Sequence, residues 1–196
     1  MVRIVDDEPS IQDLFTRMAA LGGFVPQAHL TAHSLLESLD ESRPGCVVLD
    51  LVLPDATGIE VLQELARREC KLPVVFVSGM ARVSEAVSAL KLGSVDFIEK
   101  PFEVQDMLAV VRRAIDLDAR NRRTEVDQGQ LRSRFEELTP REREVMEQIV
   151  QGAANKEVAA TLGLSPKTVE VHRANVMRKT NAHSLAELVR MRLAVH

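Results

Sequence analysis

The sequence predicts an α/β fold, a doubly wound five-stranded parallel sheet of strand order 2-1-3-4-5, followed by an all-α four-helix domain with a helix-turn-helix. In the first 117 of the 196 residues, short apolar runs alternate with segments whose apolar residues recur every three or four positions. Such alternation is typical of a parallel sheet covered by helices. The remainder shows only helical spacing, and at this length two domains can each bury a core.

Five apolar runs are expected to form the strands, at residues 2–5, 24–30, 46–49, 73–77 and 95–98. A helix is expected after each, at about residues 11–21, 35–39, 59–66, 83–90 and 104–115, where apolar residues recur at helical spacing. Thr31 is a suitable N-cap for the second helix. Because helices connect the successive strands, the strands should run parallel, with both faces of the sheet covered.

Polar residues of particular types follow four of these strands. Asp6 and Asp7 follow the first strand and Asp50 the third, Ser78 follows the fourth, and the fifth runs into Lys100. In a doubly wound sheet the carboxyl ends of the strands open into one crevice, so these groups should meet there. Each residue alone is best explained as a strand end, but together they are the types that phosphoryl transfer needs. Clustered carboxylates also require a cation, and open hard oxygen ligands suit Mg²⁺.

This set of residues resembles the signature of the response-regulator receiver domain, a flavodoxin/CheY-like fold, over about residues 1–117. The resemblance implies that Asp50 is the phosphoacceptor, a nucleophile that takes a phosphoryl group from a cognate histidine kinase. It also implies Mg²⁺ as the cofactor. Asp7, Asp50 and the backbone carbonyl of Val52 would bind the ion directly, and Asp6 would act through water.

The same resemblance assigns three further roles. Lys100 would bind one phosphoryl oxygen, and Ser78 would move its hydroxyl toward another once Asp50 is modified. Phe97 occupies the aromatic switch position and would rotate inward as Ser78 moves. The Lys100–Pro101 bond is expected to be cis. No separate substrate is implied, so the protein would catalyse only its own aspartyl phosphorylation and dephosphorylation and would not be an enzyme in the usual sense.

Charge is distributed unevenly along the chain. Residues 1–116 carry 11 Lys and Arg against 18 Asp and Glu, a net charge of −7, and residues 117–196 carry 14 against 11, a net charge of +3. The second half is therefore expected to face nucleic acid, although the absence of Trp and Tyr argues against stacking on single-stranded bases. The early acidic residues do not suit a secretory signal, and no apolar run approaches the ~20 residues that span a bilayer. A cytoplasmic protein without membrane contact is expected, with Cys46 and Cys70 in or near the core.

Residues 118–135 are rich in Arg, Glu, Asp and Gln and contain no Pro and a single Gly, Gly129. They are expected to form a charged linker between a receiver domain at 1–117 and a second domain at 136–196. Two structures fit this composition about equally well: a helical extension of the preceding helix, which Gly129 could interrupt, and a flexible solvated spacer.

Capping residues divide the second domain into helices. Helix-start and helix-stop residues recur through it: Thr139-Pro140, Gly152, Asn155, Gly163, Ser165-Pro166 and Ser184. Thr139 with Glu142 is a capping box that has proline at the first helical position. A helix, a tight turn at Gly163 and a capped helix from Ser165 is the outline of a helix-turn-helix. The outline alone is common among packed helices, so the residue types of the third helix matter.

At 100° per residue, Val169, Val176 and Thr180 of the third helix face inward. The opposite face mixes Thr, Val, Asn and cations, which suits a DNA major groove because these groups can bind adenine edges, thymine methyls, guanine and phosphate. Lys179 and His172 lie at the flanks, where phosphate contacts set the register, and a structural role is equally open for His172. The expected DNA-binding residues are Lys167, Thr168, Val171, His172, Asn175, Arg178 and Lys179.

The runs Asn-Lys-Glu-Val-Ala-Ala at 155–160 and Leu-Ser-Pro-Lys-Thr-Val-Glu-Val-His-Arg-Ala-Asn-Val-Met-Arg-Lys at 164–179 resemble the LuxR/FixJ class of DNA-binding domain. With the receiver resemblance, the chain is similar to two-component response regulators of the FixJ/NarL type. This implies a phosphorylation-dependent transcription regulator, expected to be an activator. Its expected partners are a cognate histidine kinase, double-stranded DNA and RNA polymerase, and it should form a homodimer when phosphorylated, through the surface from about Arg82 to Phe97.

Two alternative functions fit part of the pattern. A phosphorylation-independent DNA-binding regulator would act through protein contacts alone, but the complete acidic pocket argues against it. A phosphatase-like α/β hydrolase would use Asp50 as its nucleophile. Haloacid-dehalogenase-type phosphatases carry a second Asp two residues later, and because that position holds Val52 here, turnover of exogenous phosphate esters should be poor.

Overall fold

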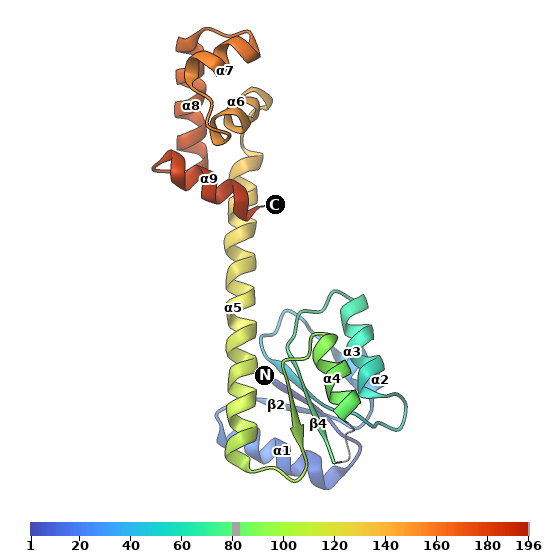
Figure 1. Ribbon diagram of the computed structural model, residues 1–196. Coiled ribbons are helices and arrows are strands. Elements are labelled where there is room, and N and C mark those ends of the chain that lie inside the picture. Colours follow the sequence, from blue (N-terminus) through green and yellow to red (C-terminus); the bar gives the residue numbers. More distant parts are fainter. Residues whose placement is uncertain (80–82, 196) are drawn as a thin grey trace. The chain divides into compact units, whose positions relative to one another are not determined.

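The computed structural model describes residues 1–79 and 83–195, with the side chains of residues 83–86 outside the description. Tertiary contacts divide the chain into two compact units, Met1–Arg122 and Arg123–His196 (Figure 1). Arg82, where the expected dimer surface begins, lies outside the described residues. Within the described part of the chain, no helix is long and apolar enough to cross a membrane.

The N-terminal unit is a parallel sheet in the order β2-β1-β3-β4-β5. Its strands are β1 (Val2–Val5), β2 (Pro26–His29), β3 (Cys46–Asp50), β4 (Val74–Ser78) and β5 (Asp96–Glu99). Its helices are α1 (Pro9–Leu21), α2 (Ala32–Ser38), α3 (Gly58–Arg67), α4 (Val83–Lys91) and the first part of α5 (Val104–Glu136). The predicted fold class and strand order are confirmed.

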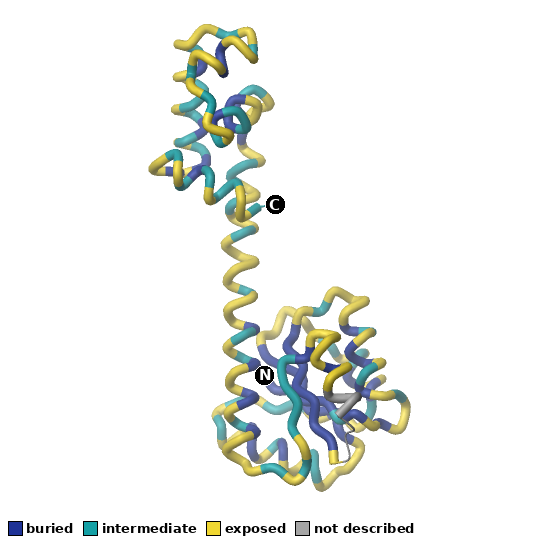
Figure 2. Tube along the Cα trace, in the orientation of Figure 1, coloured by how far each residue is buried: buried dark blue, intermediate teal, exposed yellow. Residues whose placement is uncertain are grey.

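Two apolar layers cover the sheet. α1 and α5 pack on one face, through residues that include Phe15 and Met107, and α2, α3 and α4 pack on the other, through residues that include Leu35 and Leu65. β3 and β4 are almost wholly buried (Figure 2), which explains why their sequences are continuous apolar runs with no alternation. Cys46 is buried within the first layer and Cys70 packs against the second, as expected.

α5 is continuous from Val104 to Glu136, so residues 118–135 are helical and Gly129 does not interrupt the helix. Within the N-terminal unit, the helix is attached to the loop that precedes β3. The buried carboxylate of Asp118 accepts a hydrogen bond from the amide of Gly45 at 2.8 Å. Arg122 donates to Asp118 and, at 2.7 Å, to the carbonyl of Glu41.

The C-terminal unit contains the four predicted helices within its described residues: α6 (Pro140–Val150), α7 (Asn155–Leu162), α8 (Pro166–Thr180) and α9 (Leu185–Ala194). Thr139 forms the expected capping box with Glu142, and Ser165 and Ser184 cap α8 and α9 through their hydroxyls. Apolar residues of all four helices, among them Val145, form one core. The local capping signals therefore predicted the helix starts correctly.

Candidate functional site

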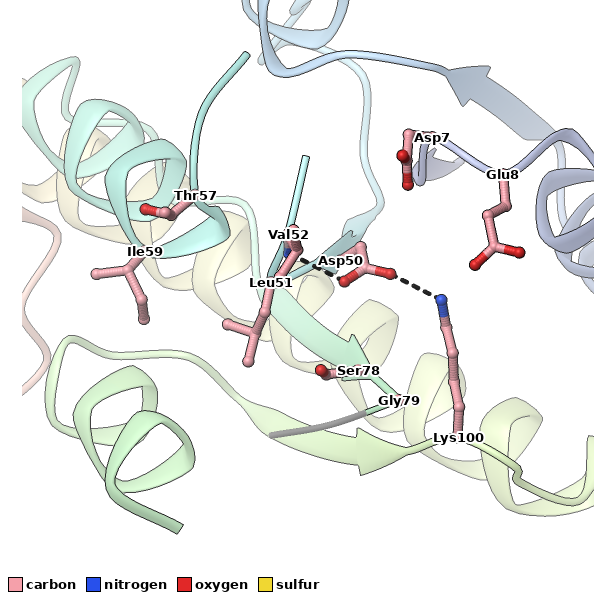
Figure 3. Close-up of a pocket in the computed structure, with 10 residues that line it drawn as sticks. All are labelled: Asp7, Glu8, Asp50, Leu51, Val52, Thr57, Ile59, Ser78, Gly79 and Lys100. Atoms are coloured by element: carbon pink, nitrogen blue, oxygen red, sulfur yellow. Dashed lines mark hydrogen bonds and ion pairs between the residues drawn. The ribbon is translucent and has the colours of Figure 1, made fainter. Parts of the chain in front are cut away.

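At the carboxyl edge of the sheet an ammonium group lies against two carboxylates, of which Figure 3 draws one, that of Asp50. Nζ of Lys100 donates to Oδ2 of Asp6 and to Oδ2 of Asp50, at 2.7 Å in each case. Asp6 directly follows β1, Asp50 ends β3, and Lys100 directly follows β5, two strands away from β3. Only a long side chain can cross that distance, which explains the choice of lysine. The Lys100–Pro101 peptide is cis, as expected.

Burial and hydrogen bonding act against each other in this cluster. Asp6 is 1% exposed, and burial raises the pKa of its carboxyl group, although hydrogen bonds from Lys100 and from the amide of Glu8 partly offset the effect. Burial opposes the charge of Lys100 too, but its hydrogen bonds to Asp50 and Asp6 outweigh that cost and raise its pKa. Lys100 therefore remains an ammonium at neutral pH.

The turn after β3 is tightly closed. The amide of Val52 donates to Oδ1 of Asp50 at 3.0 Å, and Val52 forms an antiparallel bridge with Thr57. A Cβ atom on Gly58 would lie 2.5 Å from the carbonyl oxygen of Asp50, so only glycine allows the chain to return this close to Asp50. Thr57 then starts α3 with a capping box.

A pocket of about 580 Å³ opens at this edge of the sheet. The residues that line it come from the ends of β1, β3, β4 and β5, from the turn after β3 and from the start of α3: Asp7, Glu8, Asp50, Leu51, Val52, Thr57, Ile59, Ser78, Gly79 and Lys100 (Figure 3). Ser78 is 5% exposed at its edge. Asp6 is buried and is not among the residues that line the pocket.

Phe97 does not line this pocket. It is half-buried, packs against the core layer that contains Leu65, and contributes to a separate hollow of about 420 Å³ with Phe102 and Glu99. The structure therefore gathers the predicted acidic, hydroxyl and ammonium groups at one edge and leaves the aromatic side chain outside it.

The donor groups in the pocket fit a magnesium ion. Among the described residues no three His, Cys, Asp or Glu side chains are arranged as a complete metal site. Mg²⁺ does not need one, because it keeps several waters and binds one or two carboxylates together with phosphate oxygens. Among its described lining residues, the pocket presents Asp7, Glu8 and Asp50 against one ammonium group, that of Lys100. This surplus of negative charge and hard oxygen ligands favours a small divalent cation.

The helix-turn-helix consists of α7 and α8. Gly163 ends α7 with a φ of 65°, a conformation that glycine adopts without strain. The hydroxyl of Ser165 accepts from the amide of Thr168 at 3.0 Å and starts α8. Val169 and Val176 are fully buried in the domain core. The predicted inward face of α8 is therefore correct.

The opposite face of α8 is available to a ligand. Lys167, Val171 and Arg178 are exposed, with Val171 at 53%, and Thr168 and Asn175 are half-buried. A β-branched apolar side chain exposed between cations and amides is costly to hydrate but suits contact with a thymine methyl group. These five residues lie on α8 as the helical spacing predicted.

Lys179 has partners inside the domain. Its Nζ donates to Oε2 of Glu142 at 2.7 Å and to the carbonyl of Glu137 at 3.1 Å. The Lys179 side chain is 20% exposed and that of Glu142 5%. Lys179 therefore attaches the end of α8 to the start of α6, an arrangement that its place on the helix did not predict. His172 is half-buried, and its Nδ1 has no hydrogen-bond partner in the described part of the chain.

Two further residues of α8 are engaged by neighbours. Nη1 of Arg173 donates to Oδ1 of Asn155, the first residue of α7, at 3.1 Å, so this arginine links the two helices of the motif. Nζ of Lys167 donates to Oε2 of Glu170 at 3.1 Å, so Glu170 pairs with a neighbouring cation on the same helix.

The pocket also has lining residues that were not predicted from the sequence, among them Glu8, Thr57 and Ile59. Glu8 directly follows Asp7, and this position was a usable signal. Thr57 and Ile59 carry no such signal, because their place depends on the path of the turn that returns to Val52.

Two family models match the chain. The model described as response regulator receiver domain matches residues 2–112. The model described as bacterial regulatory proteins, luxR family, matches residues 136–192. The first covers the sheet with its pocket, and the second covers the helix-turn-helix.

Similar proteins match over almost the whole chain. The transcriptional regulatory protein FixJ of Rhizobium meliloti (strain 1021) is 40% identical over 193 residues, which cover 98% of this chain and 95% of FixJ. Among solved structures, the response regulator StyR matches with a TM-score of 0.86 and 34% identity, over 98% of this chain and 97% of StyR. Full-length FixJ from B. japonicum matches with a TM-score of 0.61 and 36% identity, over 99% and 96%. The chain therefore belongs to the two-component response regulators of the FixJ type, which combine a receiver domain with a LuxR-type DNA-binding domain.

Proposed function

We propose that this protein is a phosphorylation-dependent transcription regulator that acts as an activator and accepts a phosphoryl group on Asp50 from a cognate histidine kinase. The observation that carries this proposal is the pairing of Lys100 with both Asp6 and Asp50 beside a pocket that Asp7 also lines. The arrangement combines a carboxylate nucleophile, a cation for the transferred group and ligands for a metal ion.

In the proposed reaction a carboxylate oxygen of Asp50 attacks the phosphorus atom of a phosphohistidine. The new P–O bond forms as the P–N bond breaks, and the histidine nitrogen keeps the electron pair. Asp7, Asp50 and the carbonyl of Val52 would hold Mg²⁺, with Asp6 acting through water, and the bound ion would reduce repulsion between the carboxylates and the incoming group. Lys100 would hold one phosphoryl oxygen.

In the product, a phosphoryl group with a charge of about −2 replaces the −1 charge of the Asp50 carboxylate. Ser78, at the edge of the same pocket, would then turn its hydroxyl toward a phosphoryl oxygen. Phe97 lies on β5 opposite Phe76 of β4, and we propose that it rotates inward as Ser78 moves. The negative charge added at Asp50 would thus change the surface that β5 presents, through the rotation of Phe97.

The proposed output is sequence-specific binding of α8 in the major groove of double-stranded DNA. Lys167, Thr168, Val171, Asn175 and Arg178 would contact bases and phosphates, with His172 at the flank. Lys179 would support the helix through its ion pair in place of contacting phosphate.

One helix-turn-helix gives a small interface, so a dimer on neighbouring half-sites is proposed. The homodimer would form through the surface from about Arg82 to Phe97, where Val87, Leu90 and Leu92 are 43%, 50% and 44% exposed. An activator also needs RNA polymerase as a partner, and we expect the protein to act in the cytoplasm because chromosomal DNA is its ligand.

Within this scheme we assign residues 1–117 to the receiver domain, 118–135 to a helical linker and 136–196 to the DNA-binding domain. No turnover of a separate substrate is proposed, only autocatalysed phosphorylation and dephosphorylation of the aspartate.

The test is to incubate the full chain with Mg²⁺ and a small phosphodonor such as acetyl phosphate, locate the added phosphoryl group by mass spectrometry, and measure binding to genomic DNA fragments by gel shift. The wild type should be modified at Asp50, shift toward dimer and bind DNA more tightly. Asp50→Ala should do none of these, and Asp13→Ala, which removes an exposed carboxylate on α1, should behave as wild type. Modification elsewhere than Asp50 would contradict the assigned site. Equal DNA affinity of wild type and Asp50→Ala under phosphodonor would instead favour a regulator that is independent of phosphorylation.

A further inference from the structure

The turn that follows Asp50 is attached to the start of a different helix. Oδ1 of Asp55 accepts a hydrogen bond from the amide of Ala32 at 3.0 Å, and Oδ2 accepts from the amide of His33 at 2.9 Å. These are the first two amides of α2, which have no partner within the helix. The hydroxyl of Thr31 accepts from the third, that of Ser34, at 3.1 Å.

A carboxylate that accepts from two consecutive amides is fixed in orientation as well as in position. The amide of His33, followed by that of Ala32, holds the pKa of Asp55 below its usual range. The carboxylate is therefore ionised at neutral pH, and the positive end of the α2 dipole favours it further. The contact joins parts of the chain that are 22 and 23 residues apart.

Asp55 lies at the tip of the turn, and the base of the same turn contacts the proposed phosphoacceptor, Asp50. The turn is closed by the bridge between Val52 and Thr57 and by a hydrogen bond from the amide of Leu53 to the carbonyl of Ala56 at 3.2 Å. At its base, the amide of Val52 donates to Oδ1 of Asp50 at 3.0 Å. A displacement of the tip would therefore move the backbone of Val52 relative to the Asp50 carboxylate.

We propose that Asp55 is a positioning residue, which anchors the turn to α2 and thereby holds the backbone of Val52 in place for the magnesium ion and for Asp50. This inference rests on the proposed function of the pocket. This positioning role differs from helix capping. If Asp55 only capped α2, its loss and the loss of Thr31 would have the same effect on the magnesium site.

The two residues give a matched pair of variants. Asp55→Ala and Thr31→Ala each remove a side-chain acceptor at the start of α2, but only Asp55→Ala releases the turn. Asp55→Asn keeps one acceptor oxygen and should therefore fall between Asp55→Ala and the wild type.

The experiment titrates full-length protein with Mg²⁺ and follows amide shifts by NMR, which requires no catalytic activity. Removing an outer-shell partner typically costs 10- to 100-fold in metal affinity, and we expect about tenfold for Asp55→Ala. Asp55→Asn should lose less, and Thr31→Ala should match the wild type. The rate of phosphorylation by acetyl phosphate should recover in Asp55→Ala at saturating Mg²⁺.

Wild-type affinity in Asp55→Ala, or an equal loss in Thr31→Ala, would overturn the inference. If Asp55→Ala does not fold, Asp55→Asn takes its place: wild-type Mg²⁺ affinity in Asp55→Asn, or an equal loss in Thr31→Ala, would overturn the inference. Absence of Mg²⁺ binding by the wild type would contradict the proposed function itself, and this result is obtained before any variant is compared.

Discussion

Replacing Glu142 by Gln should destabilise the C-terminal unit by about 2–3 kcal/mol, because it leaves the ammonium of Lys179 unpaired in a largely buried position. Gln retains an oxygen that can accept from the amide of Thr139, as Glu142 does at 2.9 Å. The capping box can therefore persist, and the substitution removes chiefly the charge.

The magnitude follows from the geometry of the pair. At the 2.7 Å separation of Lys179 and Glu142, Coulomb attraction is roughly 6 kcal/mol for an effective dielectric constant near 20. Desolvation of both ions offsets much of it, and removal of one partner of a fully buried pair typically costs about 3–5 kcal/mol. The 20% exposure of the Lys179 side chain lets water reach the ammonium, so we expect a smaller value.

The assay is urea unfolding of the full chain, followed by NMR signals assigned to each unit, because the chain contains no Trp or Tyr and two units need not unfold together. Glu142→Gln, Lys179→Met and the double variant form a thermodynamic cycle. The two substitutions should be coupled by about 2 kcal/mol. If the loss of unfolding free energy in the double variant equals the sum of the two single-variant losses to within ~0.5 kcal/mol, the reasoning is refuted, since independent sites add to about that precision.

The same pair predicts a pH dependence. The hydrogen bond from Lys179 outweighs burial and lowers the pKa of Glu142 from its usual 4.5. The stability that the ionised carboxylate contributes is therefore complete above pH 4.5 and is lost as the pH falls through the lower, folded-state pKa. The difference in unfolding free energy between wild type and Glu142→Gln should stay constant from pH 7 to about 5 and shrink in more acidic solution. A difference that grows with acidification would contradict this.

Two predictions concern the N-terminal unit. Burial lowers the pKa of His29 from 6.5, so on acidification the unfolded chain takes up a proton before the folded protein does. The stability contributed by neutral His29 is therefore lost as the pH falls below 6.5. His29→Gln should flatten the decline in unfolding free energy between about pH 7 and 5, and an unchanged slope would exclude His29 as the source of that decline. Gly58→Ala should slow phosphorylation of Asp50, because its Cβ would meet the Asp50 carbonyl oxygen at 2.5 Å. Gly129→Ala is the matched control: apart from the helix's own backbone, no atom of the described residues lies within 4 Å of its Cβ, so it should leave that rate unchanged while favouring the helix by about 1 kcal/mol.

Much of this protein is determined locally by its sequence. The periodicity of apolar residues predicted the strands and helices, and residues such as Thr31, Thr139 and Ser165 predicted helix starts, because a cap acts on amides two or three positions away. The pocket was predictable for a second reason. Parallel strands place their carboxyl ends at one edge, so Asp50 and Lys100 had to approach each other once the strand order was known.

Other features were decided by the tertiary structure. Sequence position did not reveal that Asp6 is buried while Asp7 lines the pocket, since both follow the same strand. The contacts of Asp55 with α2 and of Lys179 with Glu142 join residues 22 to 37 positions apart. Whether such groups meet depends on how far apart packed helices and turns lie, to within an ångström. Periodicity and capping carry information about neighbours along the chain, but they carry none about these distances.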